Sequence, residues 1–125
     1  MFKRFPVEYQ MDSQDCGPAS LKIIAKHFGK YYSLQYLRDQ CGIRREGVSM
    51  LDLSTGAENI GLRTLAIKCS IDDLVDKVPF PAIVFWNDNH FVVVYDADRK
   101  YIRVSDPAKG RIKYTHEEFR KGWYA

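Results

Sequence analysis

Apolar residues early in the chain recur with the period of an amphipathic helix. The positions with i, i+3, i+4, i+7 spacing are Leu21, Ile24, Ala25 and Phe28. Lys22, Lys26 and Lys30 form the opposite stripe, and Gly29 supplies a stop signal. The pattern predicts a first helix that ends at Gly29 and has one apolar and one basic face.

Capping signals predict two more helices in this half of the chain. Ser33 can cap a short helix that runs to about Gln40. Ser49 and Asp52 form an S-x-x-D capping box that opens a third helix, which Gly61 ends. The residues of this third helix that share one face are Met50, Leu53, Ala57 and Ile60.

The second half of the chain is richer in strand signals. Residues 62–68 are predicted to form a strand, and Ser70 with Asp73 then opens a short helix that Pro79 and Pro81 stop. Beyond this bend, which separates two halves of one domain, four β-prone runs are joined by polar turns, the first of them Asn87-Asp88-Asn89. The runs are Ala82–Trp86, Phe91–Tyr95, Tyr101–Ser105 and Arg111–Tyr114, and they predict a meander.

Helices followed by strands favour an α+β fold, with N-terminal helices packed on a C-terminal antiparallel sheet. Thr115 and Glu118 form a last capping box, whose helix is expected to direct Phe119 and Trp123 into the core.

The 125 residues, 46% of them hydrophobic, suit one domain spanning residues 1–125. No apolar run approaches the roughly 18 residues of a membrane-spanning helix. Polar residues also follow the N-terminal Met1–Arg4 stretch too soon for a secretory signal.

Charge and cysteine content narrow the chemistry. The net charge is +3 with both signs interspersed, so no polybasic tract indicates a nucleic-acid partner. Cys16, Cys41 and Cys69 are an odd number at wide spacing, which is typical of a reducing compartment such as the cytoplasm. No C-x-x-C or H-x-x-x-H spacing indicates a zinc site, and we expect neither a metal nor a cofactor. Cys41 and Cys69 are interpreted as packing residues.

Cys16 lies where the first helix should begin. Pro18 is compatible with a first helical turn, because its missing N–H would have no partner there. The positive end of the helix dipole favours a thiolate, which is the nucleophilic form of cysteine. Cys16 is therefore a candidate nucleophile. The alternative is that it is simply a small apolar residue of the core.

His90 opens an otherwise apolar strand, an unusual place for a polar ring unless it faces a cleft. If Tyr95 lies opposite Tyr101 in the hairpin, His90 falls opposite Asp106, and the carboxylate can orient the imidazole. A slip of one residue would put the two side chains on opposite faces. The alternative is that Asp106 only starts a turn and His90 only ends a strand.

Two glutamines precede the candidate nucleophile. Acyl transfer develops negative charge on the carbonyl oxygen, which a side-chain amide and the Cys16 N–H can stabilise. Gln10, six residues before Cys16, is the better candidate, because Gln14 is too close in sequence to fold back over the sulfur. Either glutamine can instead be a surface residue.

Three other polar or aromatic residues are weaker candidates. His27, near a helix end, and His116, in a first helical turn, are interpreted as structural or solvent-facing. Trp86 can line a substrate cleft beside the polar turn, but an aromatic residue at a strand end more often belongs to the core.

Taken together, these motifs resemble the papain-like leader peptidase domains at the N-termini of peptide-exporting ABC transporters, which process bacteriocin and lantibiotic precursors after a Gly-Gly pair. The resemblance spans nearly the whole chain. Its motifs in the first half are Tyr9-Gln10, Asp15-Cys16-Gly17-Pro18-Ala19-Ser20-Leu21, Tyr31-Tyr32-Ser33-Leu34, Leu37-Arg38 and Gly47-Val48-Ser49. Those in the second half are Ile60-Gly61-Leu62, Pro81-Ala82, His90-Phe91-Val92-Val93, Ser105-Asp106-Pro107, and Glu118-Phe119 with Trp123.

The resemblance implies a papain-like cysteine endopeptidase. At the matching positions it implies Cys16 as nucleophile, His90 as base, Asp106 as orienting carboxylate and Gln10 as oxyanion donor. The aspartate takes the place of papain's asparagine. The implied partners are a precursor peptide with an N-terminal leader and the membrane and ATPase regions of an ABC exporter. The implied location is the cytoplasmic, inner face of the cell membrane.

Two interpretations of the chain remain beside this one. It has no G-x-x-x-x-G-K-[ST] motif, so it is either an excised domain or a free-standing peptidase. The main alternative function is a non-catalytic domain that only docks the leader. Related docking domains have another residue in place of the cysteine, so Cys16 argues against that function.

Overall fold

The computed structural model describes residues 4–87 and 89–123. Its elements follow the order η1 (Ser13–Asp15), α1 (Cys16–His27), α2 (Leu34–Cys41), α3 (Met50–Asn59), α4 (Ile71–Asp76), β1 (Ala82–Trp86), β2 (His90–Ala97), β3 (Tyr101–Asp106), β4 (Gly110–Thr115) and α5 (His116–Gly122). Met1–Lys3 and Asp88 of the expected Asn87-Asp88-Asn89 turn lie outside the described residues. The predicted α+β order is confirmed.

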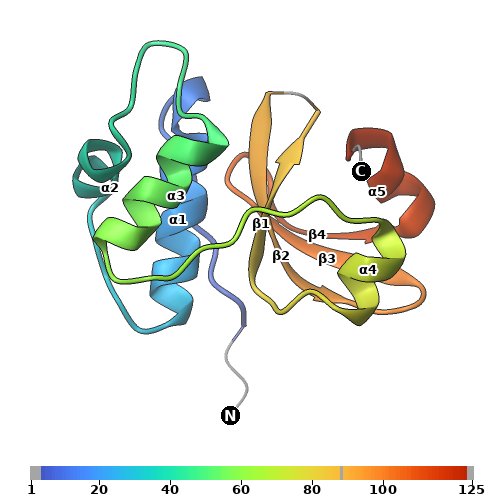
Figure 1. Cartoon of the computed structure of the whole chain (residues 1–125). Helices are drawn as coiled ribbons and strands as arrows, with labels where there is room; N and C mark the ends of the chain where they lie inside the picture. The colour runs from blue at the N-terminus through green and yellow to red at the C-terminus, as the bar shows by residue number, and fades with distance from the viewer. Residues whose placement is uncertain (1–3, 88, 124–125) are drawn as a thin grey trace.

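Three helices, α1, α2 and α3, form a layer on one side of the sheet (Figure 1). Their predicted starts are confirmed. Ser33 Oγ accepts the N–H of Tyr36 at 3.1 Å, and Ser49 forms its capping box with Asp52. The buried residues between these helices are Leu21, Ala25, Leu37, Cys41, Leu53, Ala57 and Ile60.

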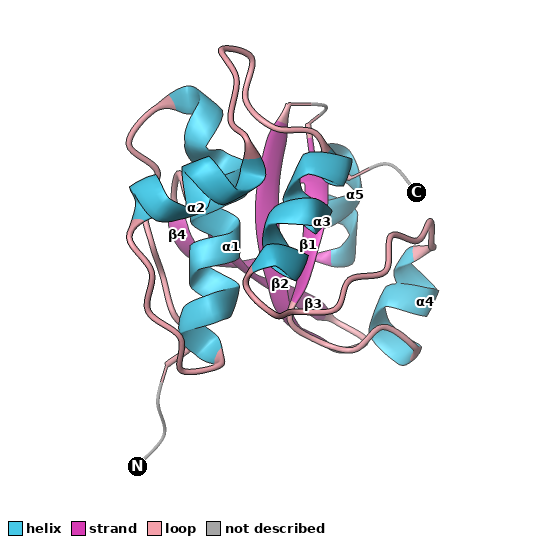
Figure 2. Ribbon diagram, turned by 60° about the vertical axis from the view of Figure 1, so that its left-hand side comes forward, coloured by secondary structure: helices cyan, strands magenta, loops and turns pink. Residues whose placement is uncertain are grey.

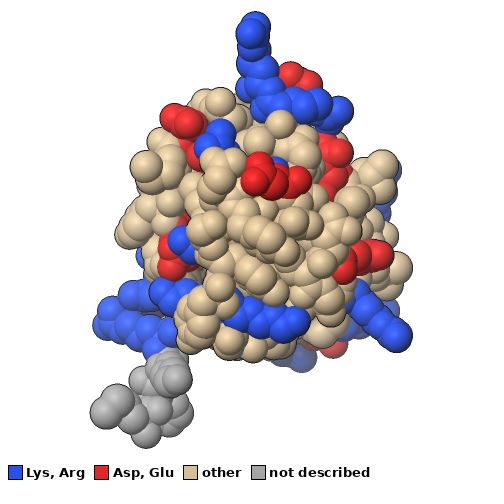
Figure 3. Space-filling view, turned by 90° about the vertical axis from the view of Figure 1, so that its left-hand side faces the viewer, with Lys and Arg blue, Asp and Glu red and all other residues tan. Residues whose placement is uncertain are grey.

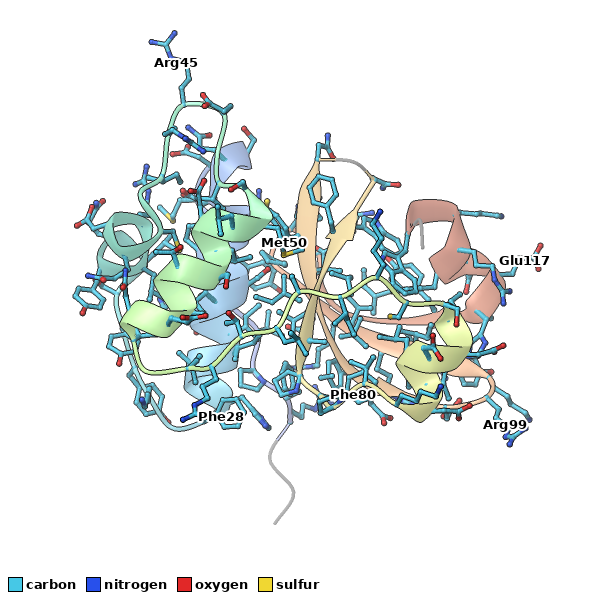
Figure 4. The ribbon with its side chains drawn as sticks, viewed as in Figure 1. Phe28, Arg45, Met50, Phe80, Arg99 and Glu117 are labelled. Atoms are coloured by element: carbon cyan, nitrogen blue, oxygen red, sulfur yellow. The ribbon has the colours of Figure 1, made fainter. Side chains whose placement is uncertain are left out.

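Two residues on the apolar faces of these helices lie at the surface. Phe28 is 55% exposed because it caps the C-terminus of α1, beyond the last turn that packs on the core. Met50 is 40% exposed because it is the first residue of α3. Figure 4 labels both at the ends of their helices. Helical periodicity therefore predicts burial well inside a helix and poorly at its ends.

The sheet is the predicted antiparallel meander, in the order β1-β2-β3-β4. Both of its faces are covered (Figure 1). Residues on the α1 side of the sheet are Ile83, Phe91 and Val93. Residues on the opposite side, which pack with α4 and α5, are Val84, Trp86, Val92, Val94, Ile102 and Val104. Alternate side chains of a strand thus enter two different cores.

The two short helices begin at the predicted caps. Ser70 Oγ accepts the N–H of Asp73 at 3.1 Å at the start of α4, and Thr115 forms a capping box with Glu118 at the start of α5. Phe119 is fully buried, as expected. Trp123 is partly buried against the same cluster.

The strand predicted over residues 62–68 is wrong. This segment is an extended loop that connects α3 to α4 (Figure 2). Leu65 is 85% exposed and Ile67 is 57% exposed. Their spacing of two residues imitates a strand, but the segment has no hydrogen-bonded strand beside it in the described sheet, which contains only β1 to β4.

The predicted pairing of Tyr95 with Tyr101 is also wrong. The structure pairs Ala97 with Ile102 and Asp96 with Arg103, and farther from the turn it pairs Val94 with Val104. Tyr95 is therefore an extra residue, a β-bulge, and its ring stacks on Phe5 at 4.4 Å between centroids. The hairpin turn is tighter than expected because the Asp98 carboxylate accepts the N–H groups of Lys100 and Tyr101.

Charges of both signs lie on the helical side of the molecule. Figure 3 shows them mainly around the margin of that face, with uncharged residues over much of its centre. Lys22 and Lys26 both pair with Glu8, at 3.1 and 3.0 Å. Among residues 4–87 and 89–123, no helix has both the length and the apolar composition that a membrane span requires.

Candidate active site

The first turn of α1 is packed tightly against the start of β2. Cys16 is the first residue of α1 and is 5% exposed. A Cβ atom on Gly17 would collide with the side chain of Val48 and would lie 3.6 Å from the Phe91 ring, so only glycine fits there. Ser20 Oγ donates to the carbonyl oxygen of Phe91 at 3.2 Å. These contacts fix the candidate nucleophile beside the strand that begins with His90.

The structure brings His90 and Asp106 together. His90 Nε2 lies 2.7 Å from Asp106 Oδ1, and the two side chains are 17% and 3% exposed. They meet although the predicted register is wrong. The true register beyond the bulge differs by two residues, which keeps both side chains on one face and makes them diagonal neighbours.

Asp106 is held as a buried carboxylate by two donors. Besides His90, the N–H of Ala108 donates to Asp106 Oδ1 at 2.7 Å. Burial acts to raise the pKa of Asp106, but the hydrogen bonds from His90 and Ala108 lower it below the usual value. The sequence Asp106-Pro107 therefore starts a turn and also supplies an ionised partner for the imidazole.

His90 is linked to the candidate nucleophile as well. Burial acts to lower the pKa of His90, but hydrogen bonds with Asp106 and Cys16 raise it to about 9. Nε2 is engaged with Asp106 at 2.7 Å, which leaves Nδ1 as the ring nitrogen that can interact with Cys16. At neutral pH the ring is an imidazolium, which favours a thiolate beside it.

Gln10 is anchored next to this cluster. Its backbone N–H donates to the carbonyl oxygen of Pro107 at 3.0 Å, and its side-chain Nε2 donates to that of Asp12 at 3.1 Å. Gln10 Oε1 is buried without a hydrogen-bond partner among the described residues. Gln14, by contrast, accepts a hydrogen bond from Ser13 in an exposed position, at 3.3 Å. The oxyanion role of Gln10 stays a prediction.

A buried charge pair near the site escaped the sequence analysis. Asp15 is fully buried, and its Oδ1 lies 3.2 Å from Nε of Arg38 on α2. Both residues belong to motifs noted above, and an aspartate directly before a helix is a common N-cap residue. Its partner is 23 positions away, however, and only the packing of α2 on α1 reveals the pair.

The other two cysteines and Trp86 lie in surroundings that fit a packing role. Cys41 is buried, and burial together with the nearby Asp52 raises its pKa to about 11. Burial and Asp73 also raise the pKa of Cys69. Trp86 belongs to the core, where it stacks on Tyr114 at 5.2 Å.

The two remaining histidines contact neither Cys16 nor Asp106. His27 packs beside Phe5, with ring centroids 5.0 Å apart. His116 Nε2 lies 2.7 Å from the carbonyl oxygen of Asp98.

Several solved structures share this arrangement of elements. One is a double glycine motif protease from an AMS/PCAT transporter in complex with the leader peptide. It is 36% identical, with a TM-score of 0.91 over 96% of this chain and 86% of that one. Another is the peptidase domain of Streptococcus ComA, an ABC transporter, at 30% identity and a TM-score of 0.89 over 96% of this chain and 93% of that one.

Two similar curated proteins are much longer than this chain. The lactococcin-G-processing and transport ATP-binding protein LagD of Lactococcus lactis subsp. lactis is 35% identical over 92% of this chain and 17% of its own length. The colicin V secretion/processing ATP-binding protein CvaB of Escherichia coli is 34% identical over 93% of this chain and 16% of its own length. The chain thus spans about a sixth of the length of these two relatives.

The match to a family of cysteine peptidases covers all but the first three residues. It extends over residues 4–125 and includes the cysteine, the histidine and the aspartate that the fold brings together. With its α+β architecture and its likeness to solved peptidase domains, this chain belongs to the Peptidase C39 family.

Proposed function

We propose that this peptidase removes the leader of a secreted peptide precursor by cleaving after a Gly-Gly type pair, with Cys16, His90, Asp106 and Gln10 as its catalytic residues. The observation that carries the residue assignment is the 2.7 Å contact between His90 Nε2 and Asp106 Oδ1, which leaves Nδ1 for Cys16, whose hydrogen bond helps to raise the pKa of His90. Such a nucleophile, base and orienting group are the parts that covalent acyl transfer requires.

The reaction follows from the charges in this cluster. The Cys16 thiolate attacks the scissile carbonyl carbon, and the carbonyl π electrons move to oxygen. The His90 imidazolium gives a proton to the departing amine as the C–N bond breaks, which leaves a thioester on Cys16. His90, now neutral, takes a proton from water, whose oxygen attacks the thioester. Collapse of that intermediate releases the leader carboxylate and restores the thiolate–imidazolium pair.

Gln10 is assigned to the oxyanion of these two tetrahedral intermediates. One hydrogen of its Nε2 is engaged with the carbonyl oxygen of Asp12, and the other is available to a ligand. The contacts with Asp12 and Pro107 hold the amide in place before substrate arrives. A preorganised donor stabilises developing charge without reorganisation during the reaction.

The substrate class and the partners are supported by the similar proteins. One solved relative is a double glycine motif protease bound to a leader peptide, and the curated relatives are processing and transport ATP-binding proteins. We therefore propose a precursor with an N-terminal leader as substrate, and the membrane and ATPase regions of an exporter as partners. The proposed place of action is the cytoplasmic face of the cell membrane.

We also propose that residues 1–125 fold as a single domain. The helical layer and the sheet share buried residues, since Phe91 packs with Cys16 and Leu21, and Val93 packs with Ile23 and Ile24. One cooperative thermal transition, seen equally by far-UV and near-UV circular dichroism, is the expected behaviour of such a shared core.

A panel of synthetic precursors tests the function. Peptides that end their leader in Gly-Gly, Gly-Ala or a bulkier pair are incubated with the chain, and products are identified by mass spectrometry. We expect cleavage after Gly-Gly, slower cleavage after Gly-Ala and none after bulky pairs. A Cys16→Ala variant, the matched control, should bind but not cut. Leader binding without cleavage by the native chain would instead support the docking function.

Limiting iodoacetamide at neutral pH should modify Cys16 before the other two cysteines. A raised pKa of about 11 leaves little thiolate on Cys41, and a raised pKa also slows the reaction of Cys69. Peptide mapping of the native protein gives the order of modification. Equal labelling of the three thiols, or protection of Cys16, would contradict its assignment as the nucleophile.

A further inference from the structure

A buried pair of opposite charges lies directly before the candidate nucleophile. Asp15, the N-cap residue of α1, is 0% exposed, and Oδ1 lies 3.2 Å from Nε of Arg38. These two atoms face each other as an ion pair without the alignment of a hydrogen bond, and neither has another partner among the described residues. A buried carboxylate is costly unless a cation compensates it, so Asp15 depends on Arg38.

The second oxygen of Asp15 shapes the backbone that leads into α1. Oδ2 accepts the N–H of Asp12 at 3.2 Å, which completes the capping box of η1. The same short turn holds Gln10, whose Nε2 donates to the carbonyl oxygen of Asp12. The Asp15 carboxylate therefore ties together the two segments that carry Gln10 and Cys16.

The charge of Asp15 also affects its neighbour. Consecutive residues are only about 3.8 Å apart at Cα, so a carboxylate at Asp15 opposes negative charge on Cys16. From other elements, the charged groups next to the thiol in the proposed site are the His90 ring on β2 and Asp106 on β3, which lies 2.7 Å from that ring. Arg38, on α2, is the cation that offsets Asp15.

We propose that Asp15 and Arg38 are positioning residues that act as a unit. The carboxylate holds the turn that presents Cys16 and Gln10, and the guanidinium cancels its charge so that a thiolate can form next to it. This inference rests on the proposed function only in taking Cys16 as the nucleophile. It predicts that the charge of Arg38, and not merely its packing, governs how readily Cys16 ionises.

Charge variants separate these effects. Arg38→Gln leaves Asp15 uncompensated, so the midpoint of Cys16 alkylation against pH should move up by about one unit, and the acid limb of the pH profile of turnover should move up with it, with little change in KM. Asp15→Asn should move the midpoint down. The double variant should return it close to the native value, and Arg38→Lys should leave it there.

The matched control is Arg44→Gln. Arg44 pairs with Asp52 at 2.7 Å in the same helical layer, but this pair is more exposed and is not adjacent to the nucleophile. Its loss should move neither the alkylation midpoint nor turnover. Alkylation is followed with iodoacetamide and peptide mapping, which also separates Cys16 from Cys41 and Cys69.

The outcomes are decisive in each case. A folded Arg38→Gln protein with the native midpoint overturns the proposal, as does a double variant more shifted than either single variant. If Arg38→Gln does not fold, Asp15→Asn decides, since an unmoved midpoint there also overturns it. Alkylation needs no peptide substrate, so variants that show these shifts, together with a native chain that cuts no precursor, would refute the proposed function and leave the charge pair supported.

Discussion

Cys16→Ala and His90→Ala should each lower turnover by on the order of 10⁶-fold, the scale seen when one member of a coupled nucleophile–base pair is removed. Asp106→Asn should be roughly ten- to hundredfold milder. The aspartate orients the imidazole, a task that a neutral amide performs in related cysteine peptidases. Steady-state kinetics on one Gly-Gly peptide measures the three losses side by side.

Asp106→Asn should also change how activity depends on pH. Hydrogen bonds with Asp106 and Cys16 raise the pKa of His90 to about 9, so activity of the native enzyme should decline as pH rises through about 9 and the imidazolium is lost. Asp106→Asn removes a carboxylate that favours the charged ring, and therefore its alkaline limb should lie at lower pH.

Asp96→Asn is the matched control for this substitution. Asp96 also lies on the β2–β3 hairpin, but it is exposed and pairs with Arg103 at 3.0 Å. It should leave turnover and the alkaline limb unchanged. A folded Asp106→Asn enzyme as inactive as Cys16→Ala, or one with an unmoved alkaline limb, would show that Asp106 does more, or other, than orient His90.

Gln10→Ala should reduce turnover by about 10²–10³-fold with little change in KM, because one oxyanion donor is lost in the transition state and not in the ground state. The fixed contacts of Gln10 with Asp12 and Pro107 are the structural reason to expect the full effect. Gln14→Ala is the control, and it should have a much smaller effect. Normal turnover in Gln10→Ala, or a greater loss of turnover in Gln14→Ala, would show that Gln10 is not the oxyanion donor.

The elements that the sequence predicted well depend on local chemistry. Ser33, Ser49, Ser70 and Thr115 each cap a helix through an N–H only three residues away, so the signal lies within one short window. The start of α1 at Cys16 could also be predicted locally, from Pro18 in its first turn.

The failures involve partners that are distant in sequence. Leu65 and Ile67 alternate like a strand, but whether such a segment pairs depends on a free sheet edge elsewhere in the fold. The Asp15–Arg38 pair depends on how α2 docks against α1. The His90–Asp106 contact was predicted from a register that is wrong by two residues, an error that happens to preserve the face of each side chain.

Because of the bulge at Tyr95, an odd or even number of residues in the hairpin decides whether His90 and Asp106 lie on the same face of the sheet. Near the turn, even-numbered residues of β2 pair with odd-numbered residues of β3, as Asp96 does with Arg103, whereas beyond the bulge even pairs with even, as Val94 does with Val104. Only the second arrangement puts His90 on the same face as Asp106. Residues in this hairpin can therefore be exchanged, but inserting or deleting a single one between the turn and His90 would separate the two side chains across the sheet. A change of two residues would restore the face. In a protein that must keep this site, the hairpin can tolerate new side chains far more readily than an odd change in length.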